Sequence, residues 1–242
     1  MDVKSDIDTQ RAYYDERWRA VTRANPLQMQ RAIAILDGLR RLGLQSPRML
    51  DLGCGTGWLA AIMGRFGPTT GVDLSPLAIR RAQALYPDVE FIAGDFFELP
   101  LANAAFDVVV SVQVIDHVED QARFVGLVAR LLRRGGHVLL ITNNAWTLSR
   151  WTRASLEAFS GGLQPIENWL TAKELEDLLA PHFRLTRLVT LLPGYGDRGI
   201  LRVANSARLA SVLKRLALFD WYQRVLLWAG LGLLLFVVGE RR

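Results

Sequence analysis

Short apolar segments alternate with amphipathic helical patterns along most of this 242-residue chain, and this alternation constrains its fold most strongly. Strands are predicted at 48–54, 69–74, 89–94, 106–113, 137–142, 183–191 and 233–239. Helices are predicted at about 8–42 and at 57–66, 76–86, 120–133 and 168–181. Near-continuous apolar strands separated by amphipathic helices indicate an α/β fold with a mostly parallel sheet covered on both faces.

The charge is spread unevenly along the chain. Residues 1–182 carry 19 Lys and Arg against 21 Asp and Glu, whereas residues 183–242 carry 10 against 3. The last quarter is therefore basic, at +7, and it is also rich in Leu, Val and Trp. Basic and apolar residues together favour a membrane surface or an amphipathic ligand over nucleic acid. A packed helical face with solvated arginines is an equal alternative.

An apolar run near the end of the chain resembles a membrane span. The uncharged run from Val225 to Gly239 is only 15 residues long, whereas a membrane-spanning helix needs about 20. Gly230 and Gly232 divide the run, so we expect a helix end followed by a strand. The polar start, MDVKSDID, differs from a secretory leader, and Cys54 is the only cysteine. We therefore expect a cytoplasmic protein without disulfides.

Three glycines follow the first predicted strand in "LDLGCGTGW". Gly53, Gly55 and Gly57 are spaced G-x-G-x-G, whereas a dinucleotide fingerprint requires G-x-G-x-x-G, and Trp58 stands where its third glycine would be. Asp51 precedes the glycines. A carboxylate there would repel a pyrophosphate and attract an amino group. The loop therefore indicates a nucleoside ligand without phosphate.

Two further acids end the next two predicted strands. Asp73 lies 20 residues beyond Gly53, where a carboxylate suits the hydroxyls of a ribose. Asp95 ends the third strand in "IAGDF", where it can accept a hydrogen bond from an adenine amino group. Three acids at successive strand ends predict a ligand rich in hydrogen-bond donors.

The ordered motifs "LDLGCGTG", "GVDLSPLAI", "FIAGDFFELP", "FDVVVSVQVIDHV" and "LLRRGGHVLLIT" resemble those of class I S-adenosylmethionine-dependent methyltransferases over about residues 48–143. The resemblance implies S-adenosylmethionine as cofactor. It also implies a Rossmann-like, seven-stranded, mostly parallel sheet with an antiparallel last strand.

The same resemblance implies roles for individual residues. Gly53, Gly55 and Gly57 would give the methionine part access to the backbone, with Asp51 near its amino group. Asp73 would hold the ribose. The remaining contacts implied with the cofactor are those of Leu74, Asp95, Phe96, Val112 and Gln113.

Within this class, the chain is similar to the O-methyltransferases of ubiquinone biosynthesis. The segments that carry this similarity are "YYDERW", "NPLQ" and "VIDHV". It adds Tyr14 and Gln28 to the implied cofactor site. That group usually has Arg at the position of Gln28 and Glu at that of Asp116, so the similarity supports a hydroxyl acceptor without fixing a quinone.

His117 is the candidate general base because it follows the fourth strand, at the edge where ligands bind. The equal alternative is a structural one, in which His117 orients the start of the next helix and Asp116 supplies charge there. His137 and His182 are expected to be structural. Tyr13, Tyr14 and Trp18 are expected either to close over the cofactor or to pack the N-terminal helix. No metal is expected, because the fifth strand ends in Thr142-Asn143-Asn144.

We divide the chain into a helical cap at 1–42, a methyltransferase core at 43–193 and 229–242, and an insertion at 194–228. In the insertion, Ser206 is expected to cap a helix with one apolar face, formed by Leu209, Val212, Leu213, Leu216 and Phe219. That face either contacts an anionic membrane or roofs the acceptor pocket. Residues 145–166 are expected to line the same pocket.

The predicted function is methyl transfer to a hydroxyl of an amphipathic, lipid-linked or secondary-metabolite small molecule. The alternatives are N- or C-methylation of a small molecule and a non-catalytic cofactor-binding partner protein. Nucleic acid is not expected as a substrate, because "QVID" follows the fourth strand where base methylases have Asn/Asp-Pro-Pro-aromatic. The motifs identify the methyl donor and leave the acceptor and the oligomeric state open.

Overall fold

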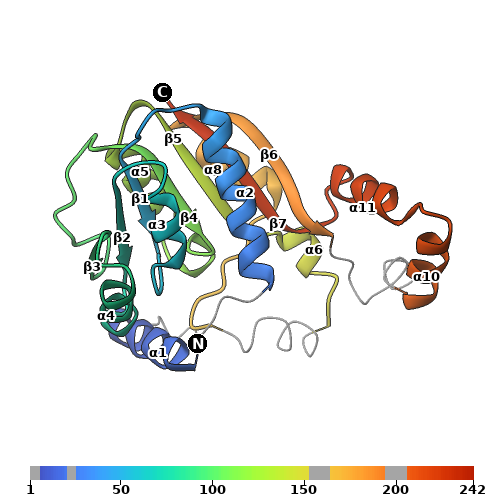
Figure 1. The fold of residues 1–242 in the computed structure, drawn as a ribbon, viewed down its shortest axis with the longest axis horizontal. Coiled ribbons are helices and arrows are strands. Elements are labelled where there is room, and N and C mark those ends of the chain that lie inside the picture. The colour runs from blue at the N-terminus through green and yellow to red at the C-terminus, as the bar shows by residue number, and fades with distance from the viewer. Residues whose placement is uncertain (1–5, 21–25, 153–163, 194–205) are drawn as a thin grey trace.

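The computed structural model describes residues 6–20, 26–152, 164–193 and 206–242, which fold around a seven-stranded sheet (Figure 1). The strand order is β3-β2-β1-β4-β5-β7-β6. The strands are β1 (Met49–Leu52), β2 (Thr69–Asp73), β3 (Glu90–Ala93), β4 (Phe106–Val112), β5 (Leu132–Asn143), β6 (Phe183–Pro193) and β7 (Gly232–Arg241). Strands β1 to β5 pair in parallel, whereas β7 runs antiparallel to both β5 and β6. The predicted sheet with an antiparallel last strand is confirmed.

Helices cover both faces of this sheet. In the described residues, the helices are α1 (Ile7–Ala20), α2 (Pro26–Leu42), α3 (Trp58–Met63), α4 (Pro76–Leu85), α5 (Gln121–Leu131), α6 (Ala145–Leu148), α8 (Ala172–Leu179), α10 (Ala207–Arg215) and α11 (Phe219–Trp228), and η1 (Ile115–His117) is a 3-10 turn. Helices α5 and α8 share one hydrophobic cluster with the sheet, and α2 and α3 share another. Alternate residues of β4 face the two clusters: Val109 packs in the first, and Val108 and Val110 pack in the second.

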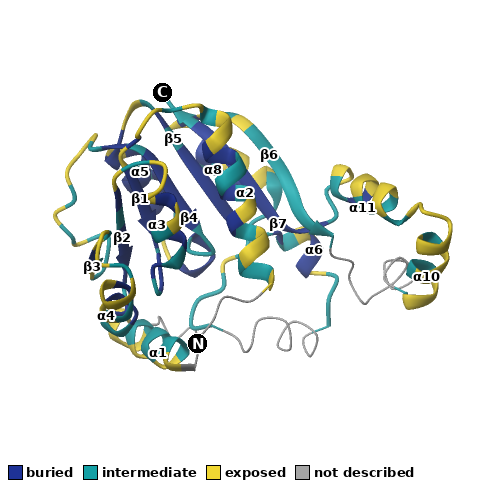
Figure 2. Cartoon of the chain, in the orientation of Figure 1, coloured by how far each residue is buried: buried dark blue, intermediate teal, exposed yellow. Residues whose placement is uncertain are grey.

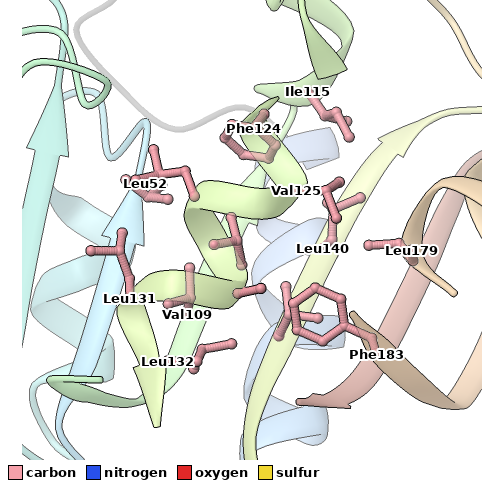
Figure 3. Close-up of a cluster of buried hydrophobic side chains, with 14 of the residues drawn as sticks. Leu52, Val109, Ile115, Phe124, Val125, Leu131, Leu132, Leu140, Leu179 and Phe183 are labelled. Atoms are coloured by element: carbon pink, nitrogen blue, oxygen red, sulfur yellow. The ribbon is translucent and has the colours of Figure 1, made fainter. Parts of the chain in front are cut away.

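The first cluster shows how a helix is fixed to the sheet. Val125 of α5 lies beside Leu140 of β5, and Phe124 of α5 and Leu179 of α8 belong to the same cluster (Figure 3). All of these side chains are almost fully buried. Burial of one such side chain contributes about 1.5–3 kcal/mol. This packing fixes the strand ends, where the functional residues lie.

The apolar run near the C-terminus becomes strand β7, which lies inside the sheet between β5 and β6. Its residues Leu234 to Val237 are 0% exposed, since β5 and β6 flank the strand and helices cover both its faces (Figure 2). Double burial explains why the sequence there is apolar without alternation. Among the described residues, the structure contains no helix long and apolar enough to cross a membrane.

Several element boundaries differ from the sequence prediction. Strand β5 begins at Leu132, five residues before the predicted start, because Leu132 pairs with Phe106 ahead of a register shift. Helix α8 begins at Ala172, since Thr171 and Glu174 form a capping box there. The N-terminal helical region is divided into α1 and α2.

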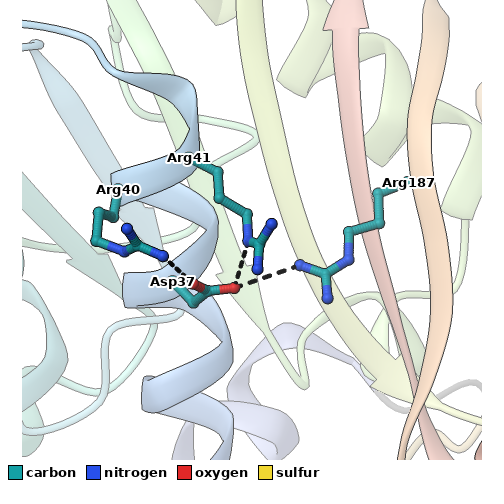
Figure 4. Close-up of polar contacts among 4 residues, drawn as sticks. All are labelled: Asp37, Arg40, Arg41 and Arg187. Atoms are coloured by element: carbon teal, nitrogen blue, oxygen red, sulfur yellow. Dashed lines mark hydrogen bonds and ion pairs between the residues drawn. The ribbon is translucent and has the colours of Figure 1, made fainter.

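Helix α2 is part of the packed layer on the sheet. Ala32 and Ile35 are buried in the second cluster, and a Cβ on Gly38 would lie 2.8 Å from Leu139. On its outer side, Asp37 pairs with Arg40 and Arg41 of the same helix and with Arg187 of β6 (Figure 4). The ion pairs are partly exposed, so their contribution is small beside the buried packing.

Helices α10 and α11 extend away from the sheet near the ends of β6 and β7 (Figure 1). Ser206 caps α10 as predicted, with its side chain accepting a hydrogen bond from Leu209 N at 3.2 Å. No residue of α10 is buried. The start of the proposed insertion, 194–205, and residues 153–163 of the expected pocket lie outside the described residues.

Candidate functional site

A cavity of about 670 Å³ lies where the carboxyl ends of the parallel strands meet helices α1 and α2. Its walls also include residues that follow β1, β2, β3 and β4, and the segment 164–169. Except for Gly57, every predicted site residue lines it: Tyr14, Gln28, Asp51, Gly53, Gly55, Asp73, Leu74, Asp95, Phe96, Val112, Gln113 and His117. The topology therefore brings together residues from six chain segments.

The glycine loop runs along the cavity wall with left-handed backbone. Gly53 has φ +79° and Gly55 has φ +54°, values that favour glycine. Space also requires glycine there, because a Cβ on Gly53 would lie 2.2 Å from Val114 and one on Gly55 would lie 2.5 Å from the ring of Trp18. Gly57 instead begins α3 and faces Phe91, away from the cavity.

Asp51 ends strand β1 with its carboxylate almost completely buried. It is 2% exposed, and its Oδ2 atom has no hydrogen-bond partner among the described residues. Burial, together with the nearby Asp73 carboxylate, raises the pKa of Asp51 to about 7 from an ordinary value of 3.8. A buried oxygen without a partner, facing a cavity, is suited to accept a hydrogen bond from a cationic ligand group.

Asp73 joins the glycine loop to the end of β2. Its Oδ2 atom accepts a hydrogen bond from Gly55 N at 2.8 Å, and its Oδ1 atom accepts one from Ser75 N at 2.9 Å. Burial raises its pKa to about 6. Each carboxylate oxygen can accept a second hydrogen bond, so the carboxylate retains capacity for ligand hydroxyls.

Asp95 and Phe96 line the same end of the cavity beyond β3. The Oδ1 atom of Asp95 accepts a hydrogen bond from Phe97 N at 2.9 Å. The ring of Phe96 packs edge-on against Phe124 of α5, with ring centroids 5.5 Å apart. Packing against the core thus holds the Phe96 ring in the cavity wall, next to Asp95.

Helix α1 forms a second wall over the glycine loop. Asp15 accepts hydrogen bonds from Ser75 Oγ and, at 3.3 Å, from Leu77 N, and Arg81 of α4 donates one to the carbonyl of Trp18. These contacts hold the Trp18 ring against Gly55. The sequence prediction named Trp18 but missed Asp15 and Arg81, because their contacts join segments about 60 residues apart.

Beyond β4, Asp116 is buried beneath the cavity. It accepts hydrogen bonds from Thr142 Oγ1 and, at 3.1 Å, from Asn143 N, and burial raises its pKa to about 7. The suggestion that Asp116 supplies charge at the start of α5 is wrong, since Asp120 caps that helix by accepting from Arg123 N at 2.8 Å. Asp116 instead ties the end of β4 to the end of β5.

His117 lies in the cavity wall and is held at both ring nitrogens. Its Nδ1 atom is 2.8 Å from the carbonyl oxygen of Ile166, and its Nε2 atom is 2.8 Å from the amide nitrogen of Gln164. Burial lowers its pKa. His137 and His182 do not line this cavity. His117 is therefore the one of the three histidines that lines the cavity.

The sequence prediction missed Arg31, which also lines the cavity. Its Nε atom is buried without a hydrogen-bond partner among the described residues, and burial lowers its pKa to about 10. Arg31 is one helical turn beyond Gln28, so the two share a face of α2. That spacing is the signal that could have identified Arg31.

Cys54 is enclosed by the loop, as its position predicts. It is buried, and burial raises the pKa of its thiol well above the ordinary value. A thiol held in its protonated form is a poor nucleophile.

Comparison with known proteins gives a consistent result. A family model described as a methyltransferase domain matches residues 50–140. A probable S-adenosylmethionine-dependent methyltransferase of Mycolicibacterium smegmatis is 37% identical over 132 residues, which cover 54% of this chain and 49% of that protein. A ubiquinone biosynthesis O-methyltransferase of Alkalilimnicola ehrlichii is 37% identical over 126 residues, 50% of this chain and 49% of that protein. The chain thus spans about half the length of these two relatives.

The fold is shared with solved structures at low sequence identity. An N-methyltransferase of Bradyrhizobium japonicum, in complex with S-adenosyl-L-homocysteine, superposes with a TM-score of 0.64 and 16% identity, over 96% of this chain and 98% of that one. At this identity the likeness establishes the Rossmann-like architecture and leaves the chemistry to the residues of the cavity.

Proposed function

Because residues 50–140 of this chain are a methyltransferase domain of the S-adenosylmethionine-dependent class, we propose that the chain transfers a methyl group to a hydroxyl of a small molecule. One observation carries the cofactor assignment: the buried Asp51 carboxylate presents an oxygen without a partner to the cavity, beside a glycine loop of left-handed backbone. An ammonium group satisfies that oxygen, whereas a phosphate would be repelled. The residues present therefore fit an amino-acid-bearing nucleoside.

In this proposal the cavity holds the cofactor along the strand ends. Gly53 and Gly55 give access to the backbone, Asp51 binds the α-amino group, and Asp73 binds the ribose hydroxyls. Leu74, Asp95 and Phe96 enclose the adenine. Val112 and Gln113 lie at the end of β4, where the methyl group is transferred; the side-chain Nε2 of Gln113 is buried without a partner among the described residues. When bound, S-adenosylmethionine supplies a methyl group already activated by its positive sulfur.

The protein then has to orient an acceptor, exclude water and take up one proton. His117 performs the last task, since it lines the cavity, burial lowers its pKa and so favours the neutral ring, and its Nε2 atom faces the amide of Gln164. A hydroxyl acceptor loses its proton on methylation, and a neutral imidazole can receive it. N-methylation remains the second candidate, because an amine nitrogen carries its own lone pair and needs no such base at the moment of attack.

Binding of the cofactor tests the proposal most directly. Isothermal titration with S-adenosylmethionine and S-adenosylhomocysteine is expected to give one site per chain. Absence of heat and of thermal stabilisation at millimolar ligand would refute it. Replacement of His117 by Ala is expected to lower turnover on a hydroxyl acceptor by about 10²- to 10⁴-fold. Turnover equal to that of the wild type would remove His117 as the base and favour N- or C-methylation.

The helices α10 and α11 favour a lipid-linked or amphipathic acceptor within this proposal. Trp228 is 89% exposed and Trp221 is 63% exposed, as large apolar side chains are at a membrane interface. The same two helices carry four basic residues and one acidic residue: Arg208, Lys214, Arg215, Arg224 and Asp220. Apolar and basic side chains together are complementary to an anionic lipid surface.

Vesicle flotation tests this contact. We expect the protein to float with vesicles of phosphatidylcholine and phosphatidylglycerol, and less with phosphatidylcholine alone. The double variant Trp221→Ser/Trp228→Ser should lose flotation, whereas the control Leu85→Ser, which changes a side chain 64% exposed on α4, should retain it. Equal flotation of both variants would exclude α11 as the contact.

A further inference from the structure

Three residues from distant parts of the chain form a hydrogen-bonded row along the cavity wall. Tyr14 of α1 donates its hydroxyl hydrogen to Gln164 Oε1 at 3.1 Å. The amide nitrogen of Gln164 lies 2.8 Å from His117 Nε2, and His117 Nδ1 lies 2.8 Å from the carbonyl oxygen of Ile166. Tyr14, His117 and Gln164 all line the cavity. The row reaches from helix α1 to the candidate base.

For a neutral imidazole, the carbonyl of Ile166 at one end determines the direction of every other hydrogen bond in the row. A backbone carbonyl only accepts, so Nδ1 of His117 carries the ring hydrogen. Nε2 of the neutral ring then holds a lone pair, which accepts an N–H from Gln164. The Tyr14 hydroxyl occupies the amide oxygen of Gln164, and this fixes which end of the amide faces the histidine.

Burial lowers the pKa of His117, which favours the neutral ring. Arg17 of α1 disfavours an imidazolium, in the same direction as burial. Of the nearby carboxylates, Asp116 accepts from Thr142 and Asn143, and Glu167 Oε1 accepts from Gln164 N at 3.2 Å. In the described structure, the lone pair of the neutral His117 ring thus already accepts a hydrogen bond from the amide N–H of Gln164.

We propose that Gln164 is a positioning residue that occupies the place of the acceptor hydroxyl, and that the acceptor displaces its amide from His117 Nε2. The inference rests on the proposed function. The amide N–H and an acceptor O–H are both donors directed at the same lone pair, so one replaces the other without turning the ring. The acceptor proton then passes from oxygen to Nε2, while the Nδ1–H bond to Ile166 keeps the imidazole in place.

Tyr14 sets the strength of this competition. While its hydroxyl holds the Gln164 oxygen, the amide N–H stays on His117, and water is kept from the base. Tyr14 therefore acts through Gln164, in addition to lining the cofactor cavity.

Nitrogen NMR of ¹⁵N-histidine-labelled protein saturated with S-adenosylhomocysteine tests the inference without an identified acceptor. We expect His117 to carry its hydrogen on Nδ1 and to leave Nε2 unprotonated at pH 7.5. Phenol serves as a minimal hydroxyl donor, and anisole, which has a similar shape but no O–H, serves as its control. Phenol should perturb the Nε2 resonance, and anisole should not.

Variants of Gln164 separate a positioning role from a structural one. In Gln164→Ala the competing amide is gone, so phenol should perturb Nε2 at a concentration about fivefold lower than in the wild type. In Gln164→Glu a carboxylate faces Nε2 and should raise the pKa of His117 by about one unit or more. Gln121→Glu is the matched control: this nearby side chain donates to the carbonyls of Ile115 and Asn168 and does not line the cavity, so the pKa of His117 should hardly change.

Two results would overturn the inference. One is a hydrogen on Nε2 of the wild-type histidine. The other is that Gln164→Ala needs the same concentration of phenol as the wild type to perturb Nε2. Either can occur while S-adenosylhomocysteine binds normally, whereas loss of cofactor binding by the wild type would refute the proposed function itself.

Discussion

At the scale of single residues, the site depends on a carboxylate that destabilises the free protein. Asp51 has a pKa of about 7 when folded and 3.8 when unfolded, so between these pH values the folded chain holds a proton that the unfolded chain has released. Its contribution to stability is therefore fully present below about pH 4 and is lost as the pH rises through about 7. The ammonium group of the cofactor would compensate for this loss.

We predict that Asp51→Asn raises the melting temperature of the free protein at pH 8 by a few degrees and changes it little at pH 5. The same variant should bind S-adenosylhomocysteine at least about tenfold more weakly, since it removes a hydrogen bond between charged groups. Differential scanning fluorimetry at both pH values and isothermal titration measure these effects. A melting temperature that falls at pH 8 would contradict the account of Asp51.

At the scale of elements, helix α1 is held over the glycine loop by its contacts with α4. Asp15 accepts from Ser75 and Leu77 at the start of α4, and Arg81 holds the Trp18 carbonyl. Trp18 then covers Gly55. The helix thus forms one wall of the cofactor cavity, and it carries the Tyr14 that contacts Gln164.

Asp15→Ala should weaken binding of S-adenosylhomocysteine by roughly fivefold or more, because it removes the acceptor that anchors α1. The control is Glu16→Ala, a neighbouring change whose carboxylate pairs with Arg19 on the surface at 2.7 Å. Titration calorimetry of both variants makes the comparison. If the two bind the ligand equally well, the anchor has no role in the site.

At the scale of the whole molecule, strand β7 places the end of the chain inside the sheet, between β5 and β6. Phe236 pairs with Ile141 of β5 and Val189 of β6, is 0% exposed, and lies against Gly38 of α2. Two neighbouring strands and helix α2 therefore meet at one side chain. Its loss would leave a cavity that none of them can fill alone.

Phe236→Ala should lower the free energy of unfolding by about 3–5 kcal/mol. Trp228→Ala, which changes an 89% exposed side chain nearby in sequence, should alter it by less than about 0.5 kcal/mol. Urea unfolding followed by circular dichroism measures both. Similar midpoints for the two variants would show that β7 does not bear on the stability of the whole sheet.

The sequence by itself determined the strands, the glycine loop and the acids Asp51, Asp73 and Asp95. These follow from local periodicity, and the acids converge because the carboxyl ends of parallel strands share one edge of a sheet. It could not determine that Trp18 lies on Gly55. Nor could it determine that Tyr14, Gln164 and His117 meet, because 150 residues separate Tyr14 from Gln164 and 47 separate His117 from Gln164. Those contacts depend on how distant segments pack. Only the tertiary structure decided which histidine nitrogen holds the lone pair, since a carbonyl at Ile166 and an amide at Gln164 fix it from opposite sides.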